Sequence, residues 1–412
     1  MRYSEELKHL PPAILNSLDA QYEVLPSPWG EFMNALGDFT NILINSYLPS
    51  NTVRKRLTPS IGRITPWIID ELADAFRTVL PECEDRWTSI KAHQMFVHLI
   101  ARSTSRILTN SLRRNEQWLE VASNYSVNVG ITILLLRPFP HFLRPFVAPF
   151  LPSVRQMKKH LRTAKSLFIP IIQERRAAEA AGDPQYEKPD DFLQWMMDMA
   201  EDEQDLDPEI MAHHNLILTS LAVVHTSSVA LCHVLYDLIQ HPEYIEPLRE
   251  EMARTLSKGW EHANKASFDA QKRLDSFLRE SQRWGPPVNT VFIFQKDPKD
   301  RDVLKVSSLR SSNQIGNEAK TPSGVDSNAT PVTSFISISP SNMHFGFGRQ
   351  ACPGRFFAAN TIKAIVSRLI MEYDFKFEKN QVGWRPANIG IGEHVFPNTQ
   401  TVVLLRRRQK GI

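Results

Sequence analysis

The chain has 412 residues, 42% of them hydrophobic, and its 48 Lys and Arg nearly balance its 45 Asp and Glu. A formal charge of +3 over this length is too small to argue for binding of nucleic acid. The hydrophobic content is that of a globular protein and excludes wholesale disorder. Three cysteines cannot form a disulfide framework, which favours a reducing, intracellular compartment or a cysteine kept for its chemistry.

The first 290 residues are predicted to form a succession of helices. Thr65-Pro66 is a typical helix start, because proline suits the first turn, where no backbone N–H is needed. The scarcity of glycine, at 16 residues, argues against a large β-protein with many tight hairpins. Periodic hydrophobic residues predict helices over Pro66–Val79, Lys91–Leu112, Val154–Ala181 and a segment from Ser267 to Trp284.

One stretch has to be weighed as a membrane span. Ile210–Tyr236 contains no Lys, Arg, Asp or Glu and is long enough to cross a bilayer. Its many His, Ser and Thr residues favour a buried helix beside a polar pocket instead. We expect this helix to start at Asp207-Pro208 and to end near His241-Pro242. The N-terminal residues MRYSEELKHL contain no apolar segment, so we expect no signal peptide or anchor there.

The segment Ile131–Pro152 is hydrophobic and rich in proline, so it cannot form one straight helix. Two interpretations stay open. The segment is either a hydrophobic flap, serving substrate entry or resting on a membrane surface, or a buried connector.

The last part of the chain changes in character. Residues 296–342 are rich in Ser, Asn, Thr and charged residues and are predicted to be mostly loop. Beyond them, Phe356–Tyr373 is predicted to be a helix, and Thr401–Leu405 a buried strand.

A glycine-rich loop, FGFGRQACPGR, presents Cys352 just before the predicted helix. Backbone N–H groups and the positive end of the helix there would favour a thiolate over a thiol. Two other interpretations compete. Gly346-x-Gly348-x-x-Ala351 formally fits a dinucleotide fingerprint, although no buried strand precedes it. Alternatively, Cys352 is an incidental buried thiol in a plain loop.

The pattern F-x-x-G-x-x-x-C-x-G, formed by Phe345, Gly348, Cys352 and Gly354, resembles the haem-binding loop of the cytochrome P-450 family. The surrounding HFGFGRQACPGRFFAAN is similar to the version in fungal secondary-metabolism members. The resemblance implies a mainly α, P-450-like fold: a large helical body with a reduced small β-portion, as one domain over residues 1–412. It also implies haem b, with the Cys352 thiolate as axial ligand to iron and with Phe345, Gly348, Arg349 and Gly354 as cofactor-binding residues.

Three further motifs match the family. Glu280 and Arg283 resemble its E-x-x-R, a structural support in which a spacing of three puts both side chains on one helical face. His225-Thr226 lies where the family has its oxygen-activation pair. The resemblance implies catalytic roles there, with Thr226 holding water and relaying protons and His225 replacing the commoner acid. Arg54 resembles the arginine that meets a haem propionate.

By this resemblance, the protein is a monooxygenase that hydroxylates or otherwise oxidises a lipophilic secondary-metabolite intermediate, a terpenoid, meroterpenoid or alkaloid. Electrons would come from NADPH through a separate cytochrome reductase. We expect peripheral contact with the endoplasmic reticulum membrane as a further option.

The chain also departs from the family. We expect the usual anchor and first strands to be missing, and the sequence predicts no pocket strands after Phe294. Lys305 stands where the arginine that completes the Glu280/Arg283 triad belongs, and Gln350 replaces a basic residue. A second hypothesis is therefore a degenerate, inactive haem-binding protein or a misassembled gene product.

Overall fold

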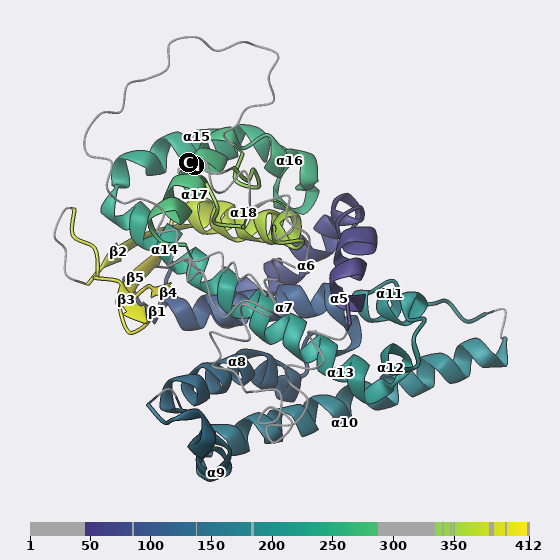
Figure 1. Cartoon of the computed structure of the whole chain (residues 1–412). Helices are drawn as coiled ribbons and strands as arrows, with labels where there is room; N and C mark the ends of the chain where they lie inside the picture. Colours follow the sequence, from purple (N-terminus) through teal and green to yellow (C-terminus); the bar gives the residue numbers. More distant parts are fainter. Residues whose placement is uncertain are drawn as a thin grey trace.

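The computed structural model describes residues 46–409, apart from 85, 137, 183–184, 287–333, 340–341, 347, 349–350, 379–382 and 392–393. Within this part, helices form most of the structure, and the strands form two small sheets at one side of the helical body (Figure 1). The prediction of a mainly α fold with a small β-portion is confirmed. Most of the predicted loop 296–342, including Lys305, and the region of the expected pocket strands lie outside the described residues.

Most of the described residues belong to regular elements. The helices are α5 (Leu48–Thr52), η1 (Val53–Leu57), α6 (Ile61–Val79), α7 (Ala92–Leu108), η2 (Asn110–Leu112), α8 (Glu116–Leu136), η3 (His141–Leu143), α9 (Arg144–Val147), η4 (Ala148–Phe150), α10 (Pro152–Ala181), α11 (Phe192–Met199), α12 (Glu203–Leu206), α13 (Pro208–Ile217), η5 (Leu218–His225), α14 (Thr226–Gln240), η6 (Pro242–Tyr244), α15 (Ile245–Thr255), η7 (Trp260–His262), α16 (Lys265–Asp269), α17 (Lys272–Trp284) and α18 (Arg355–Glu372). The strands are β1 (Thr88–Lys91), β2 (Tyr373–Phe377), β3 (Ile389–Ile391), β4 (His394–Phe396) and β5 (Val402–Arg407).

The long helix made of α13, η5 and α14 crosses the middle of the molecule (Figure 1). Its predicted start is confirmed, because the Asp207 side chain accepts the Glu209 N–H at 2.8 Å. The helix Pro208–Gln240 and α8 are both long and apolar enough to cross a membrane, but 67% of the most apolar window of the first is buried, against 44% for α8. Because it packs against α7, α8, α10 and α17, the central helix is a core element, as predicted.

The predicted buried strand is confirmed and is the central strand of the larger sheet. β5 pairs antiparallel with β1 on one side and with β2 on the other, in the order β1-β5-β2. Val403 and Leu405 of β5 are fully buried. Because β2 follows α18 directly, the sheet is joined to the helix that comes after the cysteine loop.

Several predicted helix boundaries were wrong. Helix α6 begins at Ile61, so Pro66 lies within it: the helical path already starts in η1, and the Ile64 N–H donates to the Ser60 carbonyl. Helix α16 begins at Lys265, because the Asn264 side chain accepts the Ser267 N–H and thereby caps the helix earlier than predicted. The segment predicted as Lys91–Leu112 is divided between β1, α7 and η2.

The segment Ile131–Pro152 is not one straight helix, as predicted. Its first residues complete α8, and three short helices, η3, α9 and η4, follow. Phe142, Phe146 and Phe150 are exposed by 71, 72 and 74%, respectively. These exposed rings favour the interpretation as a flap over that as a buried connector.

Candidate functional site

The cysteine loop turns sharply before α18. The Cys352 N–H donates to the Phe345 carbonyl at 2.7 Å, which closes the loop on itself. Gly346 and Gly348 have φ angles of 76° and 63°, a left-handed conformation that side chains disfavour. The two glycines therefore make the turn that brings Cys352 to the helix start, and Arg349 and Gln350 lie outside the described residues.

The Cys352 sulfur lies against the backbone at the N-terminus of α18. A Cβ added to Gly354 would be 3.9 Å from Sγ, which is ordinary contact. Burial raises the pKa of the Cys352 thiol, while the Gly354 and Arg355 backbone N–H groups and the Arg355 charge act in the opposite direction. The backbone N–H groups therefore favour the thiolate, as predicted, but desolvation acts more strongly in the opposite direction. A bound metal would reverse this balance, since a coordinating thiol is deprotonated.

Arg355 lies beside the cysteine, and Arg54 acts on Arg355 through its charge. Arg355 Nη1 donates to the Cys352 carbonyl at 3.0 Å, and its buried Nε has no hydrogen-bond partner among the described atoms. The pKa of Arg355 is lowered by burial, and the positive charge of Arg54 lowers it further. Two guanidinium groups near enough to repel one another, with one donor unused, suit an anionic group such as a haem propionate. Arg355 was not assigned from the sequence, although it directly follows Gly354.

An aromatic cluster supports the start of the loop. The rings of His344 and Phe345 lie 4.4 Å apart, and Phe335 is 5.1 Å from His344 and 5.2 Å from Phe345, measured between ring centroids. The ring nitrogens of His344 lie 2.9 Å from Asn342 Oδ1 and 2.9 Å from the Phe335 carbonyl, and the neutral ring donates to one of these two acceptors. Burial lowers the pKa of His344 to about 4. The cluster fixes Phe345 from one side and leaves it in place to pack against a flat ligand.

A buried ion pair, missed by the sequence analysis, connects this region to two helices. Lys363 Nζ of α18 lies 2.8 Å from Asp275 Oδ1 of α17, and both side chains are 6% exposed. Lys363 also donates to the Phe268 carbonyl, and Asp275 accepts the Phe335 N–H at 3.4 Å. The pair therefore joins α17, α18 and the chain that leads into the cysteine loop. No local pattern signals it, because its partners come from distant parts of the sequence.

Glu280 and Arg283 are brought together on α17. Arg283 Nε donates to Glu280 Oε2 at 2.8 Å and Nη2 to Oε1 at 2.5 Å, while Trp284 Nε1 donates to Oε1 at 2.9 Å. Arg283 lowers the pKa of Glu280, and Glu280 raises the pKa of Arg283. The side chains are 57% and 37% exposed in the described structure. The pair has the geometry that the spacing predicts.

His225 and Thr226 lie where η5 gives way to α14, but they face different partners. The Thr226 hydroxyl donates to the Ala222 carbonyl one turn earlier, at 2.7 Å. His225 Nε2 lies 2.8 Å from the Ser123 carbonyl of α8, and burial lowers its pKa. His225 is thus hydrogen-bonded to a neighbouring helix, which the sequence did not predict.

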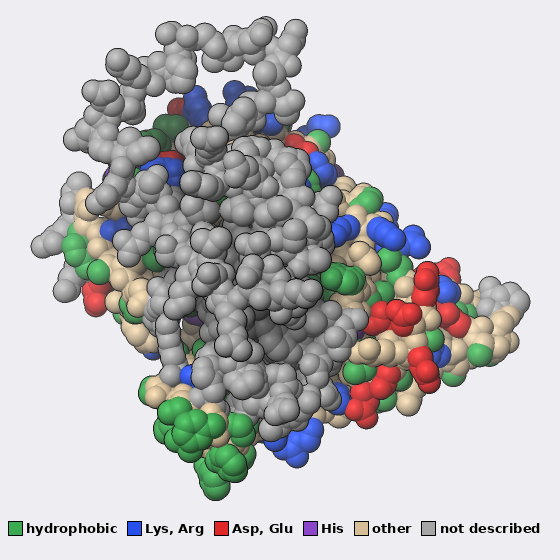
Figure 2. Space-filling model, in the orientation of Figure 1, with side chains coloured by type: hydrophobic (Ala, Val, Ile, Leu, Met, Phe, Trp, Pro, Cys, Tyr) green, Lys and Arg blue, Asp and Glu red, His purple; other side chains and the backbone are tan. Residues whose placement is uncertain are grey.

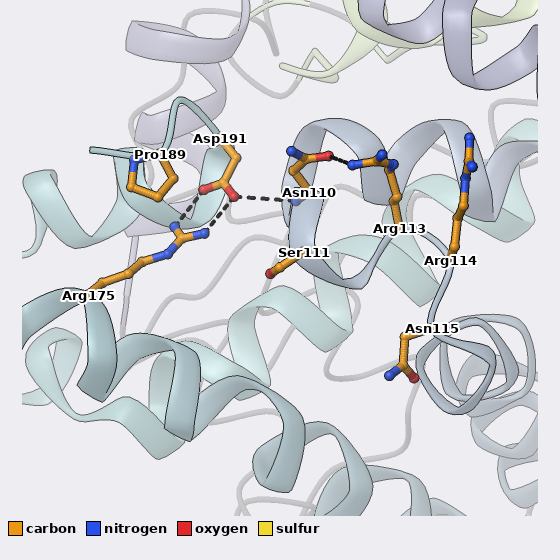
Figure 3. A pocket seen from close by; sticks show the side chains of 8 residues that line it. All are labelled: Asn110, Ser111, Arg113, Arg114, Asn115, Arg175, Pro189 and Asp191. Atoms are coloured by element: carbon orange, nitrogen blue, oxygen red, sulfur yellow. Dashed lines mark hydrogen bonds and ion pairs between the residues drawn. The ribbon is translucent and has the colours of Figure 1, made fainter. Parts of the chain in front are cut away.

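A further hollow of about 600 Å³ lies between α10, η2 and the start of α11 (Figure 3). Among its lining residues, Arg175 and Asp191 are in direct contact in a bidentate pair, with both N···O distances 2.7 Å. Asp191 also accepts the Gln194 N–H and so caps α11. None of the predicted site residues that the structure describes lines this hollow, and its charged groups serve the junction of these helices.

The loop, the thiol with its backbone donors and the central helix together define a site of the haem-thiolate class. Comparison with known proteins agrees: residues 53–304 match the family model of cytochrome P-450. The chain is 42% identical to the cytochrome P-450 monooxygenase penP of Penicillium crustosum and 42% identical to paxP of Penicillium paxilli, covering 99% of this chain and 80% of each relative. It is 39% identical to janP of Penicillium janthinellum, over 100% of this chain and 81% of the relative.

The chain belongs to the cytochrome P-450 family. It is therefore a haem monooxygenase whose iron takes a cysteine thiolate as ligand, as the resemblance implied. As a member of this family, it takes electrons from a redox partner and binds a small-molecule substrate.

Proposed function

We propose that this chain oxidises a lipophilic secondary-metabolite intermediate of the terpenoid, meroterpenoid or alkaloid class, with Cys352 as the iron ligand. The observation that carries this proposal is the Cys352 thiol, placed next to Gly354 at the start of α18 by a loop that closes through the bond from the Cys352 N–H to the Phe345 carbonyl. The substrate class is supported by the likeness of the cysteine loop to fungal secondary-metabolism members. In the reaction, substrate, O2, NADPH and a proton give the hydroxylated product, water and NADP⁺, and a cytochrome reductase delivers the electrons.

The residues around Cys352 fit the cofactor. Arg54 and Arg355 would hold a propionate, which satisfies the unused Arg355 Nε and separates the two positive charges. Phe345, Gly348 and Gly354 would contribute to the haem site from the cysteine loop, and the resemblance implies the same role for Arg349, which lies outside the described residues. When bound, haem supplies the redox chemistry and activates O2, with the thiolate donating electron density to the iron.

The protein's own groups then control protons and water. The Thr226 hydroxyl, which donates to the Ala222 carbonyl, can accept a hydrogen bond from water through its lone pairs. Glu280 and Arg283 hold the last turn of α17 as a structural support.

The first test is the absorption spectrum of the reduced, carbon-monoxide-bound protein. The wild-type chain should show the spectral shift of an intact thiolate ligand, and Cys352→Ala should lose it. Cys83→Ala is the matched control, because Cys83 is a buried thiol in another part of the fold. A folded wild-type protein that binds no haem would favour the inactive alternative, and a Cys352→Ala protein that keeps the band would refute the ligand assignment.

The second test concerns substrate. The protein, with a fungal cytochrome reductase and NADPH, is incubated with a panel of terpenoid, meroterpenoid and alkaloid intermediates under ¹⁸O2. We expect a product that carries one atom of ¹⁸O and needs NADPH. Turnover of polar substrates alone would contradict the proposed substrate class.

A second function, contact with a lipid surface, is favoured by one further observation. Hydrophobic side chains gather at the end of the molecule formed by the last turns of α8 and the short helices after it, at the lower left of Figure 2. We call Phe139, Phe142, Leu143, Phe146 and Phe150 the phenylalanine patch; these residues are exposed by 37 to 74%. Arg155 at the start of α10 donates to the Phe150 carbonyl at 3.2 Å, so a positive charge lies beside the patch. Apolar rings flanked by a basic residue suit an anionic membrane interface.

Flotation with vesicles of phosphatidylcholine and phosphatidylserine tests this contact. Phe146→Asp with Phe150→Asp should reduce the floated fraction at least about fivefold, because charged groups are costly in the bilayer interface. Tyr244→Asp is the control, since Tyr244 is also exposed but lies on η6. Equal flotation of the double variant and the wild type would exclude the patch as the lipid contact.

A further inference from the structure

The long central helix changes its hydrogen-bond pattern next to Thr226. Leu218–His225 is a π-helix, and α-helix continues on both sides of it. Such segments are rare, pack their backbone less well than an α-helix and persist when other contacts compensate. We therefore expect contacts from neighbouring helices to stabilise η5.

Helix α8 makes one such set of contacts, at Ser126. The Ser126 N–H donates to Ser220 Oγ at 3.1 Å, the Ser126 hydroxyl lies 3.3 Å from the Ser220 carbonyl, and the two hydroxyl oxygens are 3.3 Å apart. Both serines are buried. Ser220 belongs to η5, so α8 holds both the side chain and the backbone of one π-helical residue.

The second contact is at the other end of the same segment. His225, the last residue of η5, has Nε2 at 2.8 Å from the Ser123 carbonyl, one α8 turn from Ser126. A carbonyl only accepts, so His225 carries its proton on Nε2 and is the donor. Its ring lies 6.2 Å from that of His93, and burial lowers the pKa of both rings, that of His93 to about 4. Two neighbouring imidazoles that resist protonation suit a fixed neutral donor better than an acid that exchanges protons.

We propose that Ser220 and His225 are positioning residues, through which the turn Ser123–Ser126 of α8 holds the π-helical form of η5. Thr226 is the residue that follows, so the clamp sets where its hydroxyl lies. This inference rests on the proposed function of Thr226 for its catalytic consequence, but not for the clamp itself. It assigns His225 to the hydrogen-bond framework in place of the proton relay that its sequence position implies.

Hydrogen–deuterium exchange of the haem-loaded full chain, followed by mass spectrometry, tests the clamp without reference to turnover. Ser220→Ala removes the hydroxyl that accepts the Ser126 N–H, and exchange in peptides covering 218–226 should become about five- to tenfold faster. Ser228→Ala is the matched control, because the buried Ser228 hydroxyl donates to the Val224 carbonyl within the same helix, at 2.6 Å. Ser126→Ala should accelerate exchange in the same peptides. The double variant Ser126→Ala/Ser220→Ala should exchange faster than either single variant, because Ser220→Ala removes the acceptor of the Ser126 N–H whereas Ser126→Ala removes the hydroxyl that donates to the Ser220 carbonyl.

The role of His225 as a hydrogen-bond donor is tested by comparing a substitution that keeps the donor with one that removes it. His225→Gln keeps an N–H donor but cannot take up a proton, whereas His225→Leu keeps bulk without a donor. We expect the Gln variant to exchange within about twofold of the wild type and to oxidise NADPH with an unchanged pH profile, and the Leu variant to exchange about tenfold faster. Unchanged exchange in both Ser220→Ala and His225→Leu would overturn the clamp. If His225→Gln exchanges like the wild type but its NADPH oxidation has a different pH dependence, His225 takes part in proton transfer.

These outcomes separate the clamp from the proposed function. If the clamp variants exchange faster while Thr226→Val changes no catalytic property, the clamp stands and the role of Thr226 fails. If the clamp variants exchange like the wild type while Thr226→Val is impaired, the role of Thr226 stands and the clamp fails.

Discussion

The backbone of Gly285 lies so close to His233 that a Cβ on residue 285 would be 2.5 Å from the imidazole Nδ1. That nitrogen accepts a hydrogen bond from Arg385 Nη2 at 2.8 Å, and Nε2 lies 3.3 Å from the Val395 carbonyl. Arg385 Nε also donates to Asp237 Oδ1 at 2.7 Å. The end of α17, just past the Glu280/Arg283 pair, is thus fixed against the central helix and the C-terminal strands.

Gly285→Ala should therefore destabilise the protein by about 1–3 kcal/mol, because His233 is held at both nitrogens and cannot move away without losing a hydrogen bond. Chemical denaturation measures this directly. Gly62→Ala is the control, since a Cβ at Gly62 of α6 meets nothing within 4 Å and alanine suits a helix better than glycine. Equal stability of Gly285→Ala and the wild type would show that the ring shifts freely.

Lowering the pH should reduce the free energy of unfolding already at pH values well above those at which carboxylates titrate. Burial lowers the pKa of His93, His233 and His344 to about 4 and that of His213 to about 3, from an ordinary value of 6.5. Below about pH 6.5 the unfolded chain takes up protons that the folded protein does not, so the free energy of unfolding falls as the pH falls. Each histidine contributes up to about 1.4 kcal/mol per pH unit between its two pKa values.

Denaturation at pH 7.5, 6.5, 5.5 and 5.0 measures this slope. His233→Gln should reduce the slope of the unfolding free energy against pH by the contribution of one histidine. Glutamine can accept a hydrogen bond from Arg385 and donate one to the Val395 carbonyl, but it does not titrate. A profile that stays level from pH 7.5 to 5.0 would contradict the prediction.

Arg54 and Arg355 should govern cofactor retention. Arg54→Gln and Arg355→Gln each remove one of the two charges that would meet a propionate, and each should weaken haem binding about tenfold. The measurement is haem absorbance per folded chain after dilution, at low and at high salt. Lys55→Gln, on the same π-helical segment as Arg54, is the control and should leave retention within about twofold. If Lys55→Gln weakens haem retention and Arg54→Gln does not, the anion is bound by Lys55 and not by Arg54.

How much the sequence predicted depended on whether the information was local. The central helix, its cap at Asp207 and the buried strand β5 were predicted because capping residues and apolar runs act within a few residues. The Glu280/Arg283 pair and the turn before Cys352 followed from helical spacing and from glycine. Two helices begin earlier than predicted: α6 because the helical path already starts in η1 before Pro66, and α16 because Asn264 caps it.

The rest of the site depends on partners far apart in the chain. His225 was placed beside Thr226 by position, but its hydrogen bond goes to Ser123, and no spacing rule connects residues on two different helices. The backbone N–H groups and the helix end that favour the Cys352 thiolate were predicted locally, whereas the larger, opposing effect of burial comes from the whole fold. The ion pair of Asp275 with Lys363 has no signal in either local sequence.

That ion pair yields a stability prediction. Lys363→Met leaves the Asp275 carboxylate buried without its cation, and Asp275→Asn leaves the ammonium without its anion, so each should cost about 3–5 kcal/mol. Asp275→Leu with Lys363→Met removes both charges and should recover part of that loss. Arg273→Ala, on an exposed pair with Glu250 of α15, is the control and should cost less than about 1 kcal/mol. Single variants as stable as the wild type would mean that water reaches the pair.

Loss of this pair should also reach the cysteine loop, because Asp275 accepts the Phe335 N–H and Phe335 packs on His344 and Phe345. Lys363→Met is expected to lower haem retention at temperatures where the protein is still folded. Circular dichroism and haem absorbance, recorded on one sample, separate the two events. Simultaneous loss of both signals would show that the pair serves global stability alone.

The hydroxyl of Thr226 should govern how much of the consumed NADPH ends in product. It donates to the Ala222 carbonyl at 2.7 Å, which leaves its oxygen free to accept from water and so to orient a proton donor. Thr226→Val keeps the shape and removes the hydroxyl, and it should lower product formation about 10- to 100-fold while the share of electrons released as hydrogen peroxide rises. Thr226→Ser keeps the hydroxyl and should stay within about threefold of the wild type. Product, NADPH and peroxide are measured together on the substrate found by the ¹⁸O2 screen, because a merely structural loss would lower all three in proportion. A Thr226→Val protein that couples NADPH to product as the wild type does would place proton delivery on another group.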